Sequence, residues 1–108
     1  MNSTTAALNE LFSRIPRRHS TENINDINSI LTEYEDILIT IEALNPFYEK
    51  NTNVFFDELE EVRSKIKKST DNKASKKMKD NFFDEASGAL KDSMQALIAI
   101  YADGKQPI

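Results

Sequence analysis

The chain contains few side chains that could carry out chemistry, and its one histidine is the first to consider. His19 lies in the segment Arg17-Arg18-His19-Ser20, between two stretches with helical patterning. A catalytic histidine needs a nucleophile or carboxylate beside it in a shared pocket, and nothing in the neighbouring sequence builds one. We therefore expect His19 to be an exposed linker residue. Ser20 follows the two arginines as basophilic kinases require, but such short patterns arise often by chance.

Sites for metals and cofactors are not predicted either. Cysteine is absent, which excludes thiolate metal sites, disulfides and cysteine nucleophiles. No Glu-x-x-His pair is present, so the di-iron arrangement of helical bundles is excluded. The acidic run 57–61 lacks the alternating ligands and the glycine of a calcium loop, and solvated surface charge explains Glu58 and Glu61. With no glycine-rich phosphate loop, we expect a non-enzymatic protein without metal or cofactor.

Charge is the most informative feature, because it is unevenly distributed along an acidic chain of net charge −4. Residues 63–79 contain eight Lys or Arg and one Asp, a net charge of +7, whereas residues 22–61 contain eleven Asp or Glu and one Lys. Positive charge is favourable at the end of a helix and unfavourable at the start of the next one, where half of these lysines fall. Folding stability alone does not explain them.

We predict that these basic residues contact an acidic surface, either on a partner protein, on a lipid headgroup or on nucleic acid. The alternative is that they only keep this part of the chain solvated. Reversal of Lys73, Lys76 and Lys77 to Glu is expected to leave thermal stability unchanged or to raise it. The predicted electrostatic contact residues are Arg63, Lys67, Lys68, Lys73, Lys76, Lys77 and Lys79.

The elements that position these residues are predicted to be helices, since only two glycines and three prolines interrupt the chain. Apolar spacing predicts a short helix over about 4–15, a long one from about 21 to 45, a third ending near 68, and a last one over about 75–102. The third could begin as late as Asn53. The product is an all-α fold, a compact antiparallel three- to four-helix bundle with a short N-terminal helix, in a single domain over 1–108.

The Asn45-Pro46 pair decides how the second and third helices are related. Asn45 can cap a new helix with Pro46 at its first position, which would let the chain reverse. The alternative is a single long helix kinked at Pro46. We favour the reversal, because unbroken helices of that length are uncommon in so small a domain.

Two phenylalanine pairs cannot point wholly into one core, because adjacent helical residues diverge by about 100°. In Phe55-Phe56 and Phe82-Phe83 one ring of each pair must face away from the core. Phe56 and Phe83 are predicted to be the outward rings. They would lie under a neighbouring helix or form an apolar patch for a partner or a second copy.

Three classes of function are compatible with these features. The first is a protein–protein interaction module, a small helical adaptor, chaperone or inhibitor that binds one partner protein. The second is a small acidic immunity or anti-host protein that neutralises a toxin or nuclease. The third is a nucleic-acid-binding regulator that uses residues 63–79, which we consider unlikely because lysines without interleaved arginines or aromatics make a poor nucleic-acid footprint. A homodimer would also fit a bundle of this size.

The predicted location is the cytoplasm. No apolar run approaches the roughly 18 residues that a membrane span needs, and the first residues lack the pattern of a signal peptide. The absence of cysteine is consistent with this expectation.

Overall fold

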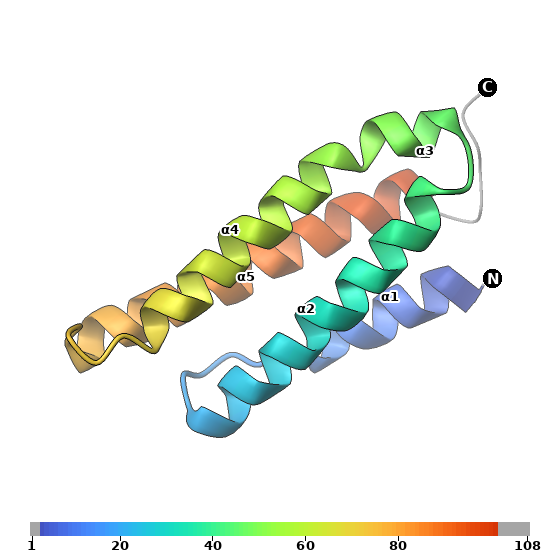
Figure 1. Ribbon diagram of the computed structural model, residues 1–108. Coiled ribbons are helices and arrows are strands. Elements are labelled where there is room, and N and C mark those ends of the chain that lie inside the picture. The colour runs from blue at the N-terminus through green and yellow to red at the C-terminus, as the bar shows by residue number, and fades with distance from the viewer. Residues whose placement is uncertain (1–2, 102–108) are drawn as a thin grey trace.

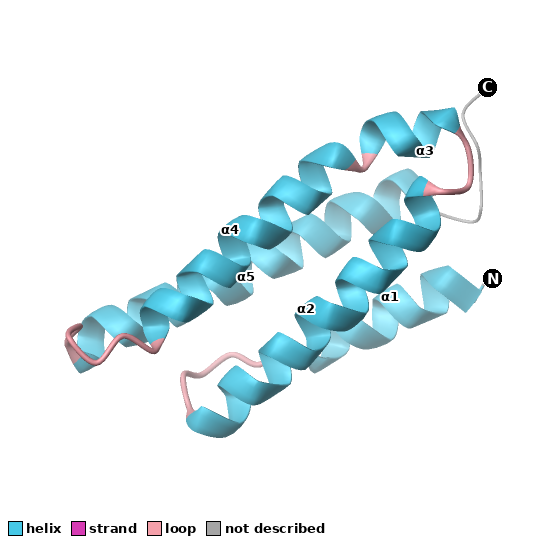
Figure 2. Cartoon of the chain, viewed as in Figure 1, coloured by secondary structure: helices cyan, strands magenta, loops and turns pink. Residues whose placement is uncertain are grey.

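The structure, a computed structural model, describes residues 3–101, which form five helices and contain no strand (Figures 1 and 2). Four of the helices pack side by side as an antiparallel bundle, and the fifth is a short helix that leads into one of them. The predicted all-α bundle with a short N-terminal helix is confirmed. The helices are α1 (Ser3–Arg14), α2 (Thr21–Glu42), α3 (Pro46–Asn51), α4 (Asn53–Ser69) and α5 (Lys76–Tyr101).

The bundle is elongated, with extents of 49 × 23 × 17 Å. Helices that follow one another along the chain pack against each other. Helix α2 packs against α1 and α4, and α5 packs against α4 and α1, so α2 and α5 face each other across a diagonal. The α1–α2 linker and the α4–α5 turn therefore lie at one end, and the α2–α3 connection lies at the other (Figure 1).

The chain reverses at Asn45, as predicted. Asn45 has extended backbone angles, and its side-chain Oδ1 accepts a hydrogen bond of 3.1 Å from the backbone N–H of Tyr48. Pro46 occupies the first helical position. A backbone N–H there would have no acceptor within the helix, so proline costs no hydrogen bond. The alternative of one kinked helix is wrong. At the start of α2, the Oγ of Ser20 accepts from the backbone N–H of Asn23 at 3.0 Å and caps that helix.

The predicted third helix is divided at Thr52 into α3 and α4. The Thr52 side chain is buried, and both its hydroxyl and its backbone N–H donate to the carbonyl of Tyr48, at 2.7 and 2.9 Å. Helix α4 begins at Asn53, the late start that the polar residues indicated. Despite the division, α3 and α4 continue one buried face, whose residues are Tyr48, Thr52, Phe55, Leu59, Val62 and Ile66.

The core holds one polar contact that crosses the diagonal of the bundle. The hydroxyl of Tyr34 on α2 lies 2.8 Å from the Oγ of Ser93 on α5, and both side chains are buried. Burial raises the pKa of the Tyr34 phenol well above its ordinary value of 10.0, and the nearby Glu58 carboxylate raises it further, against the lowering effect of the Ser93 hydrogen bond. The pair joins the two long helices that do not pack directly against each other.

The orientation predicted for Phe83 is wrong. Its side chain is 0% exposed, and the ring of His19 lies against it with centroids 5.6 Å apart. The α1–α2 linker covers this side of α5, so the other ring of the pair, Phe82, is the partly exposed one. Phe56 is partly buried while its neighbour Phe55 is 3% exposed, as predicted for the outward member.

Candidate functional site

One end of the α4–α5 hairpin extends beyond the rest of the bundle (Figure 1). The α1–α2 linker reaches α5 at Asp80, where the Nδ1 of His19 lies 3.0 Å from the Oδ1 of Asp80. Residues 70–78 lie past that contact, and no residue between Ser69 and Phe83 is buried. Met78 is accordingly 50% exposed. We call the six lysines between residues 67 and 79, at this end of the hairpin, the basic tip: Lys67, Lys68, Lys73, Lys76, Lys77 and Lys79.

The turn that carries the basic tip is held by short polar side chains. The hydroxyl of Thr70 donates to the carbonyl of Lys67 at 2.8 Å, and the Oδ1 of Asp71 accepts from the backbone N–H of Lys73 at 2.9 Å. The Oγ of Ser75 accepts from the backbone N–H of Met78 at 3.2 Å and caps α5. None of these bonds uses a lysine side chain, so the ammonium groups are not needed to form the turn.

The charge of the basic tip is largely unneutralised within the molecule. Lys76 lies 3.6 Å from Asp80, but its side chain is 91% exposed, and an exposed pair of this kind contributes little. The ammonium of Lys68 lies 5.7 Å from the centroid of the Phe82 ring. The remaining tip lysines form no ion pair with any residue in 3–101: Lys67, Lys73, Lys77 and Lys79.

Arg63, which was predicted to belong to this surface, has a different role. Its guanidinium makes two hydrogen bonds to Glu35 on α2, of 3.1 and 3.2 Å, and a third to Glu60 of 3.0 Å. This bidentate pairing lowers the pKa of the Glu35 carboxyl, and it links α2 to α4. Arg63 is therefore engaged inside the molecule, because antiparallel packing brings the acidic α2 beside it. We omit it from the basic tip.

A hollow of about 580 Å³ lies on the turn side of the basic tip. Its volume is in the range of ligand-binding sites, which are about 300–1,000 Å³. Sequence reasoning missed its polar members, Ser64, Thr70 and Asn72, because the hollow depends on the path of the turn. The residues that line it are Ser64, Lys67, Lys68, Thr70, Asp71, Asn72 and Lys73.

The α1–α2 linker adds two arginines to the same end of the molecule. Arg17 and Arg18 line a smaller hollow, of about 270 Å³, together with Lys76 and with the acidic Asp80 and Asp84. The prediction that His19 is an exposed linker residue is wrong, since its side chain is only 18% exposed. The linker folds back on α5, and a hydrogen bond of 2.6 Å from the Ser87 hydroxyl to the Pro16 carbonyl holds it there.

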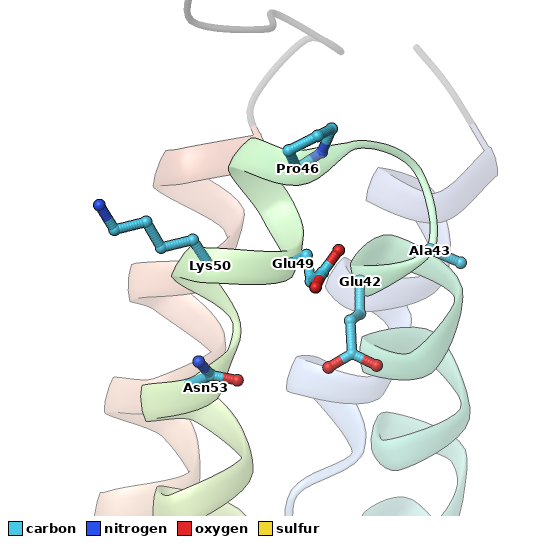
Figure 3. A pocket seen from close by; sticks show the side chains of 6 residues that line it. All are labelled: Glu42, Ala43, Pro46, Glu49, Lys50 and Asn53. Atoms are coloured by element: carbon cyan, nitrogen blue, oxygen red, sulfur yellow. The ribbon is translucent and has the colours of Figure 1, made fainter.

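The opposite end of the bundle has a different charge. A hollow of about 500 Å³ lies between the end of α2 and α3, and Figure 3 shows the side chains of Glu42 and Glu49 in the space between these two elements. The ammonium of Lys50, on the same rim, points away from the hollow (Figure 3). Within residues 3–101, the hollow at the basic tip has a lining of net positive charge, and the hollow at the opposite end has a lining of net negative charge.

Reversing the charge of the basic tip is expected to preserve or raise stability. In a Lys73→Glu/Lys76→Glu/Lys77→Glu variant, two of the new carboxylates lie in the first turn of α5, which has no acidic residue now. Each should gain about 0.3–1 kcal/mol from the helix dipole at low ionic strength. Replacing the exposed Lys76–Asp80 pair with two like charges at i, i+4 should offset about 0.5–1 kcal/mol of this, through the lost attraction and the new repulsion together. Thermal denaturation followed by circular dichroism measures the effect, and a fall of several degrees in Tm would contradict the dipole argument.

Comparison with protein-family models, with curated proteins and with solved structures gave no match. None of the helices in residues 3–101 combines the length and the apolar character that crossing a bilayer requires.

Proposed function

We propose that this protein is a non-enzymatic interaction module whose basic tip docks on an acidic surface of one partner protein. The observation that supports this most is the concentration of six lysines on a protruding hairpin end whose turn is held by Thr70, Asp71 and Ser75 and not by lysine side chains. Long-range attraction between such a patch and an acidic surface speeds association and selects partners by charge.

The acidic side of the bundle favours a protein partner over an extended polyanion. Helices α2 and α4 are neighbours, and together they carry nearly all the acidic residues of the segment 22–61. That side would be repelled by a long phosphate backbone or by an anionic membrane. A local acidic patch on a folded protein could meet the basic tip without approaching the acidic residues of α2 and α4.

Nucleic acid is the second candidate, and the linker supports it. Arg17 and Arg18 lie beside Lys76, so arginines do contribute to this end of the molecule. A titration with duplex DNA tests this alternative, because each phosphate contact steepens the dependence of affinity on salt. Binding to DNA that is tighter than binding to any captured protein, with a steep salt slope, would overturn the proposed protein partner.

A pair of matched charge-reversal variants tests the proposed function. Lys73→Glu/Lys77→Glu changes two exposed tip lysines, and Lys50→Glu/Lys91→Glu makes the same change in net charge elsewhere on α3 and α5. Partners are captured in source cells through a photoreactive phenylalanine analogue at Met78, which is half exposed on the tip. Affinity for the purified partner is then measured for each variant.

We expect the tip variant to lose at least tenfold in affinity and the control variant to lose less than twofold. The loss should shrink as ionic strength rises, since salt screens exposed charges. An equal loss in both variants would show that only net charge matters, and a larger loss in the control would place the interface elsewhere.

A further inference from the structure

We propose that the hollow on the turn side of the basic tip is the anchor site for a short acidic peptide segment of the partner. The hollow would seat a carboxylate of that segment, while the other tip lysines attract the partner from a distance. This inference rests on the proposed function and assigns separate roles to two parts of the basic tip.

The lining of the hollow is suited to an anionic group. Lys67, Lys68 and Lys73 supply ammonium groups, which only donate hydrogen bonds, and the side-chain amide of Asn72 supplies a further donor. Asp71 is the one acidic residue in the lining, and one of its carboxylate oxygens already accepts from the backbone. The lining thus keeps a net charge of +2.

The volume of the hollow indicates an occupant larger than a free ion. At about 580 Å³ it is open enough for several atoms of a peptide backbone as well as an acidic side chain. Serine and threonine hydroxyls at Ser64 and Thr70 line its wall. The Thr70 hydroxyl donates to the Lys67 carbonyl and leaves its oxygen able to accept from a peptide N–H.

One of the lysines is held in place before any partner binds. The ammonium of Lys68 lies 5.7 Å from the centroid of the Phe82 ring, within the range of a cation–π interaction. A side chain that is already restricted loses less conformational entropy on binding. Lys68, which lines the hollow, therefore has a more restricted side chain than a fully solvated lysine.

The lysines of α5 do not share this environment. Lys76 and Lys77 do not line the hollow, and Lys76 is paired with Asp80 on its own helix. Charges at the edge of an interface mainly change the association rate, whereas paired charges inside it mainly change the dissociation rate. The hollow lysines should control how long the partner stays bound.

Two matched double variants distinguish the two parts of the basic tip. Lys67→Gln/Lys73→Gln removes two charges from the hollow, and Lys76→Gln/Lys77→Gln removes two from α5. All four side chains are exposed, so circular dichroism should show both variants folded like the wild type. The probe is a hexaglutamate peptide, with hexaglutamine as the uncharged control, titrated into ¹⁵N-labelled protein.

We expect hexaglutamate to shift the amide resonances of Ser64, Thr70 and Asn72 saturably, and hexaglutamine to leave them unchanged. The hollow variant should bind hexaglutamate at least fivefold more weakly, and the α5 variant less than twofold more weakly. Equal weakening in both variants would overturn the anchor site but leave the proposed function standing. Shifts centred on another surface, or the absence of any shift, would overturn both.

Discussion

Replacing Phe83 with alanine is expected to lower the free energy of unfolding by about 3–5 kcal/mol, and the same change at Phe82 by less than half of that. Phe83 is fully buried between the α1–α2 linker and the core, so its removal leaves a cavity as well as losing apolar burial. Phe82 is partly exposed, and the ammonium of Lys68 lies 5.7 Å from the centroid of its ring. Urea denaturation of the two variants measures the difference.

The two substitutions control for each other, because they make the same chemical change at adjacent positions of one helix. Helix propensity and the entropy of the unfolded chain change equally in both, so the difference reports burial alone. A loss of 3–5 kcal/mol is a large part of the 5–15 kcal/mol that holds a typical domain folded. Equal losses at Phe82 and Phe83 would mean that the linker does not cover Phe83 as the structure shows.

Local sequence signals were sufficient to predict most of the fold. The cap at Asn45 and the stop at Pro16 act through the backbone of neighbouring residues, so they can be recognised without tertiary structure. The spacing along α4 is equally direct, because Phe55, Leu59, Val62 and Ile66 recur every three or four residues and are all buried on one face. A helix with one apolar face leaves no doubt about which side is buried.

Features that depend on a distant segment could not be predicted in this way. The spacing on α5 admits either Phe82 or Phe83 as the buried ring, and only the path of the α1–α2 linker decides between them. The same linker folds back so that His19 is partly buried and Arg17 lines a hollow together with Lys76, more than fifty residues away in the chain. The lysines of the basic tip were recognised by composition, but the hollow was not, since its wall depends on the turn.

The buried pair of Tyr34 and Ser93 gives a second large effect. We expect Tyr34→Phe and Ser93→Ala each to lower the free energy of unfolding by about 1–3 kcal/mol, because each leaves a buried hydroxyl without its partner. The double variant removes both hydroxyls and should cost clearly less than the sum of the single changes. Additive losses, measured by urea denaturation in a double-mutant cycle, would contradict the pairing.

The same tyrosine should make the fold sensitive to alkali. Burial raises the pKa of Tyr34 above the ordinary 10.0, so the folded protein keeps a proton that the unfolded chain loses. The protonated Tyr34 therefore contributes its full stabilisation below about pH 10. This stabilisation is lost as the pH rises toward the pKa that Tyr34 has in the folded protein. Thermal denaturation between pH 8 and 11.5 should show a falling Tm, and the fall should be shallower in Tyr34→Phe. Some dependence of Tm on pH should remain in Tyr34→Phe, since burial also raises the pKa of Tyr48. If the dependence in Tyr34→Phe were as steep as in the wild type, Tyr34 would ionise as freely in the folded protein as in the unfolded chain.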